Sequence, residues 1–195
     1  MPLKQICVYC GSNGGRQPEY LEQARAFGQE LVKRDIGLVY GGAAVGLMGA
    51  VADGVMQAGG RAVGIIPVSL MQKELAHRGL TELHVVQSMH ERKTMMAERA
   101  DGFVALPGGA GTLEEIFETW TWAQLGMHQK PCGLLNIAGY YDDLARFLDH
   151  TVAEAFMQPQ HRAMLAVESD AGALLDRFAA YEPPTVSKWI AQGEH

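Results

Sequence analysis

Short apolar runs rich in β-branched residues alternate along the chain with longer segments in which apolar residues recur every three or four positions. The first pattern is typical of buried strands and the second of amphipathic helices. We expect strands at residues 6–9, 36–40, 62–66, 83–86, 102–106, 131–136 and 164–167. Helices are expected from residue 18 to about 31, at 47–58 and 90–100, up to about residue 126, and at 141–156 and 172–181. The alternation predicts an α/β, three-layer, Rossmann-like fold with a sheet of about seven mainly parallel strands flanked by helices.

The chain is expected to form a single domain. Its 195 residues lie within the range that one hydrophobic core supports, and no change of composition marks a boundary. Hydrophobic residues make up 48% of the chain, which is enough for a sizeable core. We assign residues 1–181 to this domain and residues 182–195 to a C-terminal tail.

Charge and hydrophobicity argue against two classes of partner. The formal net charge of −6, from 16 Lys and Arg against 22 Asp and Glu, does not fit a nucleic-acid footprint. No window approaches about 18 continuous apolar residues, and the first residues lack the apolar stretch of a signal peptide. We therefore expect a cytoplasmic protein that binds neither nucleic acid nor a membrane.

Cysteine and histidine spacing gives no sign of redox or metal chemistry. Cys7 and Cys10 have C-x-x-C spacing, but they belong to a predicted strand, whereas redox pairs of this spacing open a helix. We interpret them as buried strand residues. The seven histidines show neither H-E-x-x-H nor another paired ligand spacing, so we expect no metal site.

Glycine-rich turns follow three of the predicted strands, at residues 11–12, 41–49 and 108–111. Ligands of open parallel sheets bind beyond the carboxyl ends of the strands, so these turns should converge on one crevice. Glycine lets backbone N–H groups approach an anion, and the helix that follows adds the positive end of its dipole, which suits a phosphate monoester. A tight connection also needs glycine for its own geometry, so each turn alone is weak evidence.

Two common nucleotide motifs are missing from these turns. The first turn lacks G-x-G-x-x-G, and Tyr40 rather than an acidic residue ends the second strand, so binding of NAD is not indicated. The third turn lacks the lysine of a Walker A loop, which argues against triphosphate and Mg²⁺ chemistry. Any phosphate site must therefore rely on backbone groups and on side chains from other segments.

The third turn and a second segment carry the candidate catalytic groups. Thr112-Leu113-Glu114-Glu115 fits a capping box, a structural role that alone would explain these residues. Residues 89–93 open another helix beside the same crevice, and an arginine there can orient a carboxylate and reach a ligand phosphate. Solvated charges on a helix face are the structural alternative for this segment.

Two motifs resemble one known family. Residues 107–115 match P-G-G-x-G-T-x-x-E, and residues 89–93 place an Arg-Lys pair at the family's distance upstream. On these motifs the chain resembles, over roughly residues 4 to 180, the LONELY GUY family of cytokinin riboside 5′-monophosphate phosphoribohydrolases, formerly described as lysine decarboxylases. One departure is visible: Ala43 follows Gly41-Gly42 where relatives usually have a third glycine, and its methyl group would narrow the crevice.

The resemblance implies a set of site residues. It assigns catalysis to Arg92 and Glu115. The residues that it implies for substrate binding are Ser12, Gly42, Met48, Glu74, Met89, Lys93, Pro107, Gly108, Gly109, Gly111, Thr112 and Thr121. It also implies a homodimer with the active site close to the interface. The apolar helix segment at residues 120–125 fits that role, although core packing explains its tryptophans equally well.

The resemblance implies hydrolysis of the N-glycosidic bond of a purine nucleoside 5′-monophosphate, either AMP or an N6-prenylated analogue. Glu115 would stabilise the cationic sugar and activate water, Arg92 would orient Glu115, and the glycine loop would hold the phosphate. We expect no cofactor, because a pyridoxal phosphate decarboxylase needs a Schiff-base lysine and Lys93 is the only one near the motifs. The competing hypothesis is a non-catalytic nucleotide or cofactor carrier of similar fold.

Overall fold

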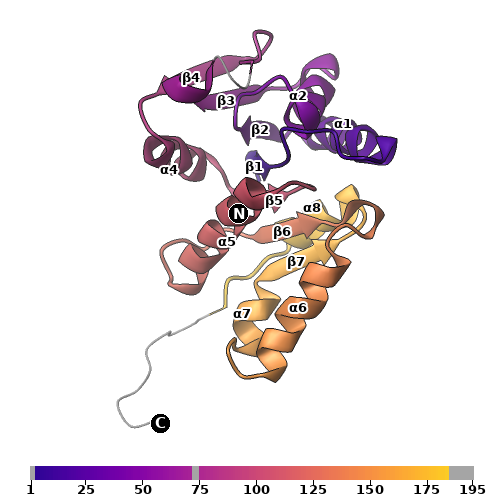
Figure 1. Cartoon of the computed structure of the whole chain (residues 1–195), viewed down its shortest axis with the longest axis vertical. Coiled ribbons are helices and arrows are strands. Elements are labelled where there is room, and N and C mark those ends of the chain that lie inside the picture. The colour runs from indigo at the N-terminus through magenta and orange to yellow at the C-terminus, as the bar shows by residue number, and fades with distance from the viewer. Residues whose placement is uncertain (1–2, 72–74, 185–195) are drawn as a thin grey trace.

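The computed structural model describes residues 3–71 and 75–184 and arranges them in three layers (Figure 1). The middle layer is a seven-stranded sheet, and all neighbouring strands in the described residues run parallel. The strands are β1 (Gln5–Tyr9), β2 (Gly37–Tyr40), β3 (Ala62–Pro67), β4 (Glu82–Val86), β5 (Gly102–Ala105), β6 (Cys132–Leu135) and β7 (Leu165–Glu168). The predicted Rossmann-like α/β fold is therefore confirmed.

Helices cover both faces of this sheet. In chain order they are α1 (Pro18–Lys33), α2 (Gly46–Gln57), α3 (Val68–Met71), α4 (Met89–Arg99), α5 (Ala110–Gln124), α6 (Asp142–Ala153), α7 (Pro159–Ala163) and α8 (Ala171–Ala179). The short helices α3 and α7 and a 3₁₀ turn, η1 (Ile137–Gly139), were not predicted, because segments this short show no helical period. The described part of the chain has no helix long and apolar enough to cross a membrane.

The two faces of the sheet belong to two separate cores because successive strand residues point to opposite sides. In β1, Ile6 and Val8 pack into the core that includes residues of α1, α2 and α8. Cys7 and Tyr9 pack into the other core, with residues of α4, α5 and α6. All three cysteines are buried and unpaired. The interpretation as a buried strand residue is confirmed for Cys7, whereas Cys10 is buried but lies one residue past the end of β1.

The order of the strands explains where a ligand can bind. The sheet runs β4-β3-β2-β1-β5-β6-β7, so the chain moves outward from β1 to β4 and then returns to the other side of β1 with β5. Helices α1 and α2 lie on one face, whereas α4 and α5 lie on the other. The loops that leave β1 and β5 therefore diverge, and a crevice opens between them at the carboxyl end of the sheet.

Candidate active site

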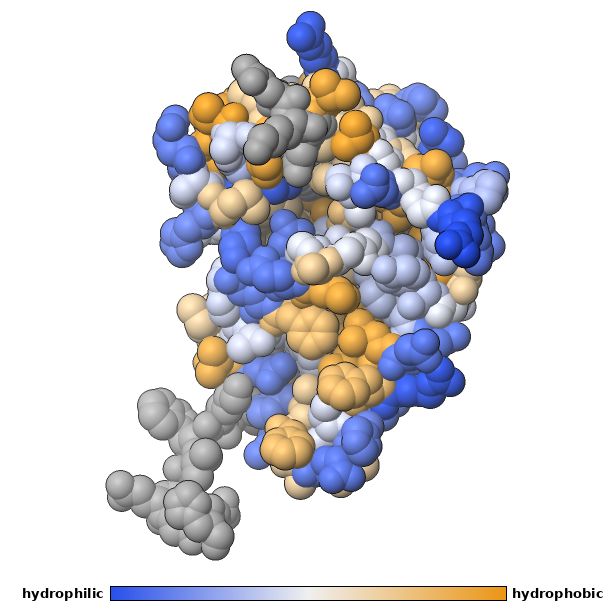
Figure 2. Space-filling model, in the orientation of Figure 1, coloured by the Kyte–Doolittle hydropathy of each residue, from blue (hydrophilic) through white to orange (hydrophobic). Residues whose placement is uncertain are grey.

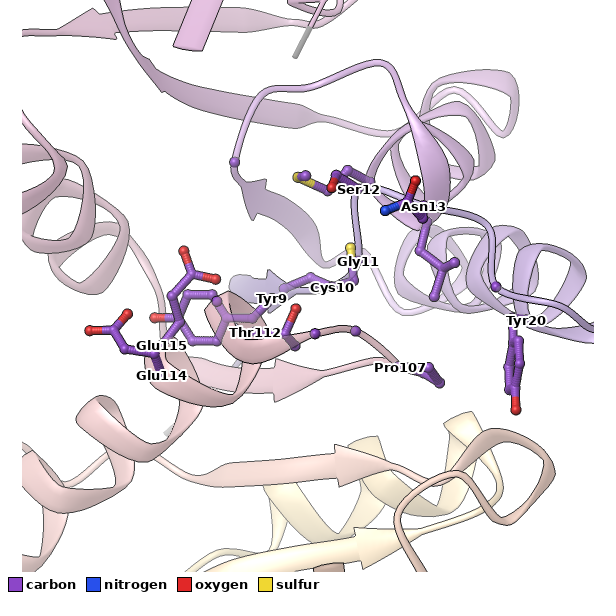
Figure 3. Close-up of a pocket in the computed structure, with 18 of the residues that line it drawn as sticks. Tyr9, Cys10, Gly11, Ser12, Asn13, Tyr20, Pro107, Thr112, Glu114 and Glu115 are labelled. Atoms are coloured by element: carbon purple, nitrogen blue, oxygen red, sulfur yellow. The ribbon is translucent and has the colours of Figure 1, made fainter. Parts of the chain in front are cut away.

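A cavity of about 470 Å³ lies at this switch point between β1 and β5. Its walls come from the segments that follow β1, β2 and β5, together with one face of α4 and the first two turns of α5. Figure 3 shows the walls formed by the segment after β1 and by the start of α5. The three glycine turns thus meet at one crevice, as the sequence predicts. Predicted site residues that line the cavity are Ser12, Met48, Met89, Arg92, Pro107, Gly108, Gly109, Gly111, Thr112 and Glu115.

The loop after β5 presents the start of α5 to the cavity. The helix begins at Ala110, and Gly109 precedes it in an extended conformation without a side-chain cap. Thr112 is therefore the third residue of the helix rather than its cap, so the predicted capping box is wrong: extended Gly109 starts the helix earlier. The first N–H groups of a helix have no partner within it, and here they belong to residues at the cavity wall.

The glycines of this loop have two different roles. A side chain on Gly108 would overlap Thr112 and approach the backbone nitrogen of Gly11 to 2.8 Å, so Gly108 is required for close packing. At Gly109 and Gly111 a methyl group would meet nothing within 4 Å. These two glycines leave open space beside the helix start, which is where an anion can approach the backbone.

Arg92 comes from the face of α4 that lines the cavity. Ser88 caps this helix by accepting a hydrogen bond from Glu91 N at 3.1 Å, and Glu91 in turn accepts one from Gln87 N at 2.8 Å. Met89, Arg92 and Met96 follow one helical stripe and all reach the cavity. The capping residues therefore fix the turn from which Arg92 projects.

The guanidinium of Arg92 is buried and contacts two neutral groups. The residue is 5% exposed, its Nη2 donates to the carbonyl oxygen of Gly41 at 3.2 Å, and its Nη1 lies 3.8 Å from the sulfur of Met89. Among the described residues its Nε has no hydrogen-bond partner. A side chain on Gly41 would overlap Nη2, so this glycine makes room for the guanidinium.

Glu115 lies on α5 at the same cavity as Arg92. Figure 3 shows it together with Glu114 near Tyr9, while Tyr20 lies at the far end of the drawn residues. Burial raises the pKa of the Cys10 thiol, and the charge of Glu115 raises it further. The cavity thus combines a buried cation, a carboxylate and a helix start, but its cysteine stays protonated and unreactive.

Three predicted binding residues do not line the cavity in the described chain. Lys93 points to α5, where its Nζ pairs with the carboxylates of Glu114 and Glu118 at 2.7 and 2.9 Å. Burial lowers the pKa of Lys93, but the two carboxylates raise it, and the net shift is upward. Thr121 donates to a carbonyl oxygen of its own helix at 2.7 Å. Gly42 has φ of +79° and packs against β3. Glu74 lies outside the described residues.

Sequence reasoning also missed several lining residues. These are Val8, Tyr9, Cys10, Asn13, Gly15, Tyr20, Leu70, Met96, Glu114 and Tyr140. Asn13 and Gly15 belong to the first glycine turn and were within reach of the turn argument. Tyr140 comes from the turn before α6 and had no local signal beyond a pair of adjacent tyrosines after a glycine.

Comparisons with known proteins identify relatives of this chain. A family model described as "Possible lysine decarboxylase" matches residues 48–178. A probable cytokinin riboside 5′-monophosphate phosphoribohydrolase of Oryza sativa subsp. japonica is 49% identical, with 93% of this chain and 80% of the relative covered. A cytokinin riboside 5′-monophosphate phosphoribohydrolase of Arabidopsis thaliana is also 49% identical, with 93% of this chain and 83% of the relative covered.

Solved structures with low identity share the fold. The molybdenum cofactor carrier protein of Chlamydomonas reinhardtii superposes with a TM-score of 0.68 at 22% identity, covering 91% of this chain and 99% of that chain. The molybdenum cofactor binding protein of Rippkaea orientalis gives a TM-score of 0.68 at 21% identity, covering 92% and 98%. At such identity the likeness extends to the fold alone. The sequence matches are far stronger, and they show that the chain belongs to the family of the cytokinin riboside 5′-monophosphate phosphoribohydrolases.

Proposed function

We propose that the protein hydrolyses the N-glycosidic bond of purine nucleoside 5′-monophosphates and releases the free base and ribose 5-phosphate. The observation that carries the proposal is one cavity that joins buried Arg92, the carboxylate of Glu115 and an open helix start. The relatives at 49% identity are named for this activity on cytokinin riboside 5′-monophosphates, which makes N6-substituted purines the first substrates to try.

The helix start of α5 is the proposed phosphate site. Gly109 and Gly111 leave its N–H groups accessible, and Thr112 adds a hydroxyl at the cavity wall. An anion at this position interacts favourably with the partial positive charge of the helix end. Binding energy from the phosphate then holds the ribose in place for the reaction, so a nucleoside without phosphate should be a poor substrate.

Glu115 and Arg92 are the proposed catalytic residues. Departure of the base leaves positive charge on the sugar, and a carboxylate beside the ribose stabilises that charge and activates the attacking water. Arg92 is proposed to bind the nucleotide and to orient Glu115, since its Nε is a donor that the described residues leave unused.

Incubation with nucleotides tests this proposal directly. Purified protein is mixed in separate reactions with AMP, N6-isopentenyl-AMP and the matching nucleosides, and the products are separated by chromatography. We expect free base and ribose 5-phosphate from at least one nucleotide and much less base from its nucleoside. Binding of every nucleotide without release of base would instead identify a carrier and overturn the proposed reaction.

We also propose that the protein is a homodimer. Leu125 and Met127, at the end of α5, are 52% and 68% exposed. Figure 2 shows further hydrophobic side chains gathered in the middle of one face of the molecule. Such surface is commonly covered by a partner. Light scattering during size-exclusion chromatography should give twice the chain mass of 21.2 kDa, whereas a mass of one chain would contradict the dimer.

A further inference from the structure

Two adjacent tyrosines from the turn before α6 hold the loop that follows β5. Tyr140 donates its hydroxyl to the carbonyl oxygen of Gly108 at 2.6 Å. Tyr141 donates its hydroxyl to the carbonyl oxygen of Leu106, also at 2.6 Å. The two bonds have the same chemistry and length, but they restrain different peptide units of the loop.

The peptide restrained by Tyr140 carries a donor of the phosphate site. The carbonyl of Gly108 and the N–H of Gly109 belong to one planar peptide, in which they point in opposite directions. A hydroxyl that fixes the carbonyl therefore also fixes the direction of the N–H. We propose that Tyr140 is a positioning residue for phosphate binding, which orients the Gly109 N–H in advance; this inference rests on the proposed function.

The peptide restrained by Tyr141 carries no such donor. Its carbonyl belongs to Leu106 and its nitrogen to Pro107, which has no N–H. Tyr141 is also 1% exposed, whereas Tyr140 is 43% exposed and lines the cavity. The chain thus provides a matched control, because loss of either hydroxyl removes one bond to the loop but only one of them orients a donor.

The turn before α6 is built to hold Tyr140 in place. Ala138 and Gly139 have φ of +52° and +70°, and the side chain of Asn136 accepts a hydrogen bond from Tyr141 N at 2.7 Å. The ring of Tyr140 packs edge to face against Tyr20 of α1, with ring centroids 5.8 Å apart. Because the ring and the backbone of Tyr140 are already held in place, little conformational entropy is lost when its hydroxyl bonds the loop.

The test measures binding of ribose 5-phosphate by isothermal titration calorimetry to the wild type, Tyr140→Phe and Tyr141→Phe. Adenine, which has no phosphate, serves as the second ligand, and a melting curve is recorded for each variant. We expect Tyr140→Phe to weaken ribose 5-phosphate binding roughly tenfold, the loss of about one hydrogen bond, and to leave adenine binding unchanged. Tyr141→Phe should lower the melting temperature while its ribose 5-phosphate binding stays at the wild-type value.

Two results would overturn the inference. One is wild-type affinity of Tyr140→Phe for ribose 5-phosphate; the other is an equal loss of affinity in Tyr141→Phe, which would mean that any weakening of the loop has this effect. The readout is independent of turnover. If the wild type binds ribose 5-phosphate but releases no base from any nucleotide, the proposed reaction fails while the role of Tyr140 is still decided by the two affinities.

Discussion

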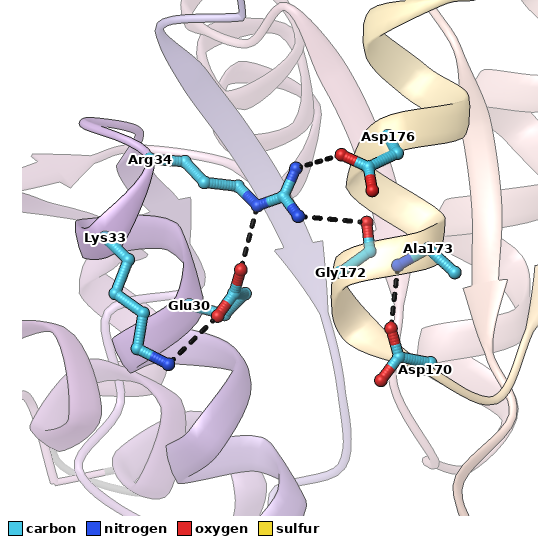
Figure 4. Close-up of polar contacts among 7 residues, drawn as sticks. All are labelled: Glu30, Lys33, Arg34, Asp170, Gly172, Ala173 and Asp176. Atoms are coloured by element: carbon cyan, nitrogen blue, oxygen red, sulfur yellow. Dashed lines mark hydrogen bonds and ion pairs between the residues drawn. The ribbon is translucent and has the colours of Figure 1, made fainter.

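Arg34 and Arg92 carry the same charge, but the fold gives them different partners. Arg34, between α1 and α8, donates to the carboxylates of Asp176 and Glu30 at 2.5 and 2.8 Å and to the carbonyl oxygen of Gly172 at 3.3 Å (Figure 4). These bonds raise the pKa of Arg34 and lower the pKa values of Asp176 and Glu30. Its charge is neutralised within the fold.

Arg92 is more deeply buried than Arg34, its guanidinium contacts the carbonyl oxygen of Gly41 and the sulfur of Met89, and its Nε has no hydrogen-bond partner among the described residues. A buried donor without a hydrogen-bond partner costs folding free energy, so such an arrangement is typical of a site that binds a ligand there. A structural arginine can thus be recognised because its guanidinium pairs with carboxylates of the fold. A ligand-binding arginine can be recognised because some of its donors have no partner in the fold. The variants below test this distinction.

Replacing Arg92 by methionine should have the largest effect on activity and should not reduce stability. We expect kcat/KM for base release to fall by roughly 100-fold or more, because the guanidinium's contacts with the nucleotide are lost. The melting temperature should stay equal or rise, since methionine fills the space without a buried charge. Steady-state kinetics and a melting curve measure both; retained activity, or a clearly lower melting temperature, would contradict the assignment.

A smaller loss of kcat/KM is expected when Arg92 is kept but its guanidinium is displaced. In Gly41→Ala the new methyl group would overlap Nη2 of Arg92, so the guanidinium must shift, and we expect roughly tenfold lower kcat/KM. Gly37→Ala is the matched control, because its methyl group would find no atom closer than 3.5 Å. Equal kinetics for the two variants would mean that the position of Arg92 does not matter.

Replacing Arg34 by methionine should reduce stability and leave activity unchanged, the opposite of what we expect for Arg92→Met. We expect a loss of about 1 kcal/mol in the free energy of unfolding, since the ion pairs are partly exposed and exposed pairs contribute little. The activity should not change because Arg34 lies outside the cavity lining. Urea unfolding and the same kinetic assay provide the two readouts, and an activity loss like that of Arg92→Met would remove the distinction between the two arginines.

The smallest expected effect is a dependence on pH of the stability that the ion pairs of Arg34 contribute. The pKa values of Glu30 and Asp176 are lowered in the folded protein, so their contribution to stability is present above the unfolded-state pKa values and is lost as pH falls through the lowered ones. The difference in unfolding free energy between wild type and Arg34→Met should therefore shrink below about pH 4. A difference that stays constant from neutral to acidic pH would show that the carboxylates are not its source.

The sequence was sufficient for the fold and for the convergence of the glycine turns, because apolar period and turn chemistry are local. The sequence was not sufficient to predict which side chains of a helix point into the cavity. Arg92 and Lys93 are neighbours on one helix, yet packing points the first into the cavity and the second to Glu114 and Glu118. The role of Tyr140 depends on a contact between segments 32 residues apart, which no local pattern encodes.

Base release by Glu115→Gln measures the central claim most directly. The variant keeps the size of the side chain but removes the charge that we propose faces the ribose. We predict that kcat falls by roughly 10²- to 10⁴-fold, while ribose 5-phosphate still binds and the melting temperature is unchanged. Base release near the wild-type rate would contradict the claim that Glu115 is the catalytic carboxylate.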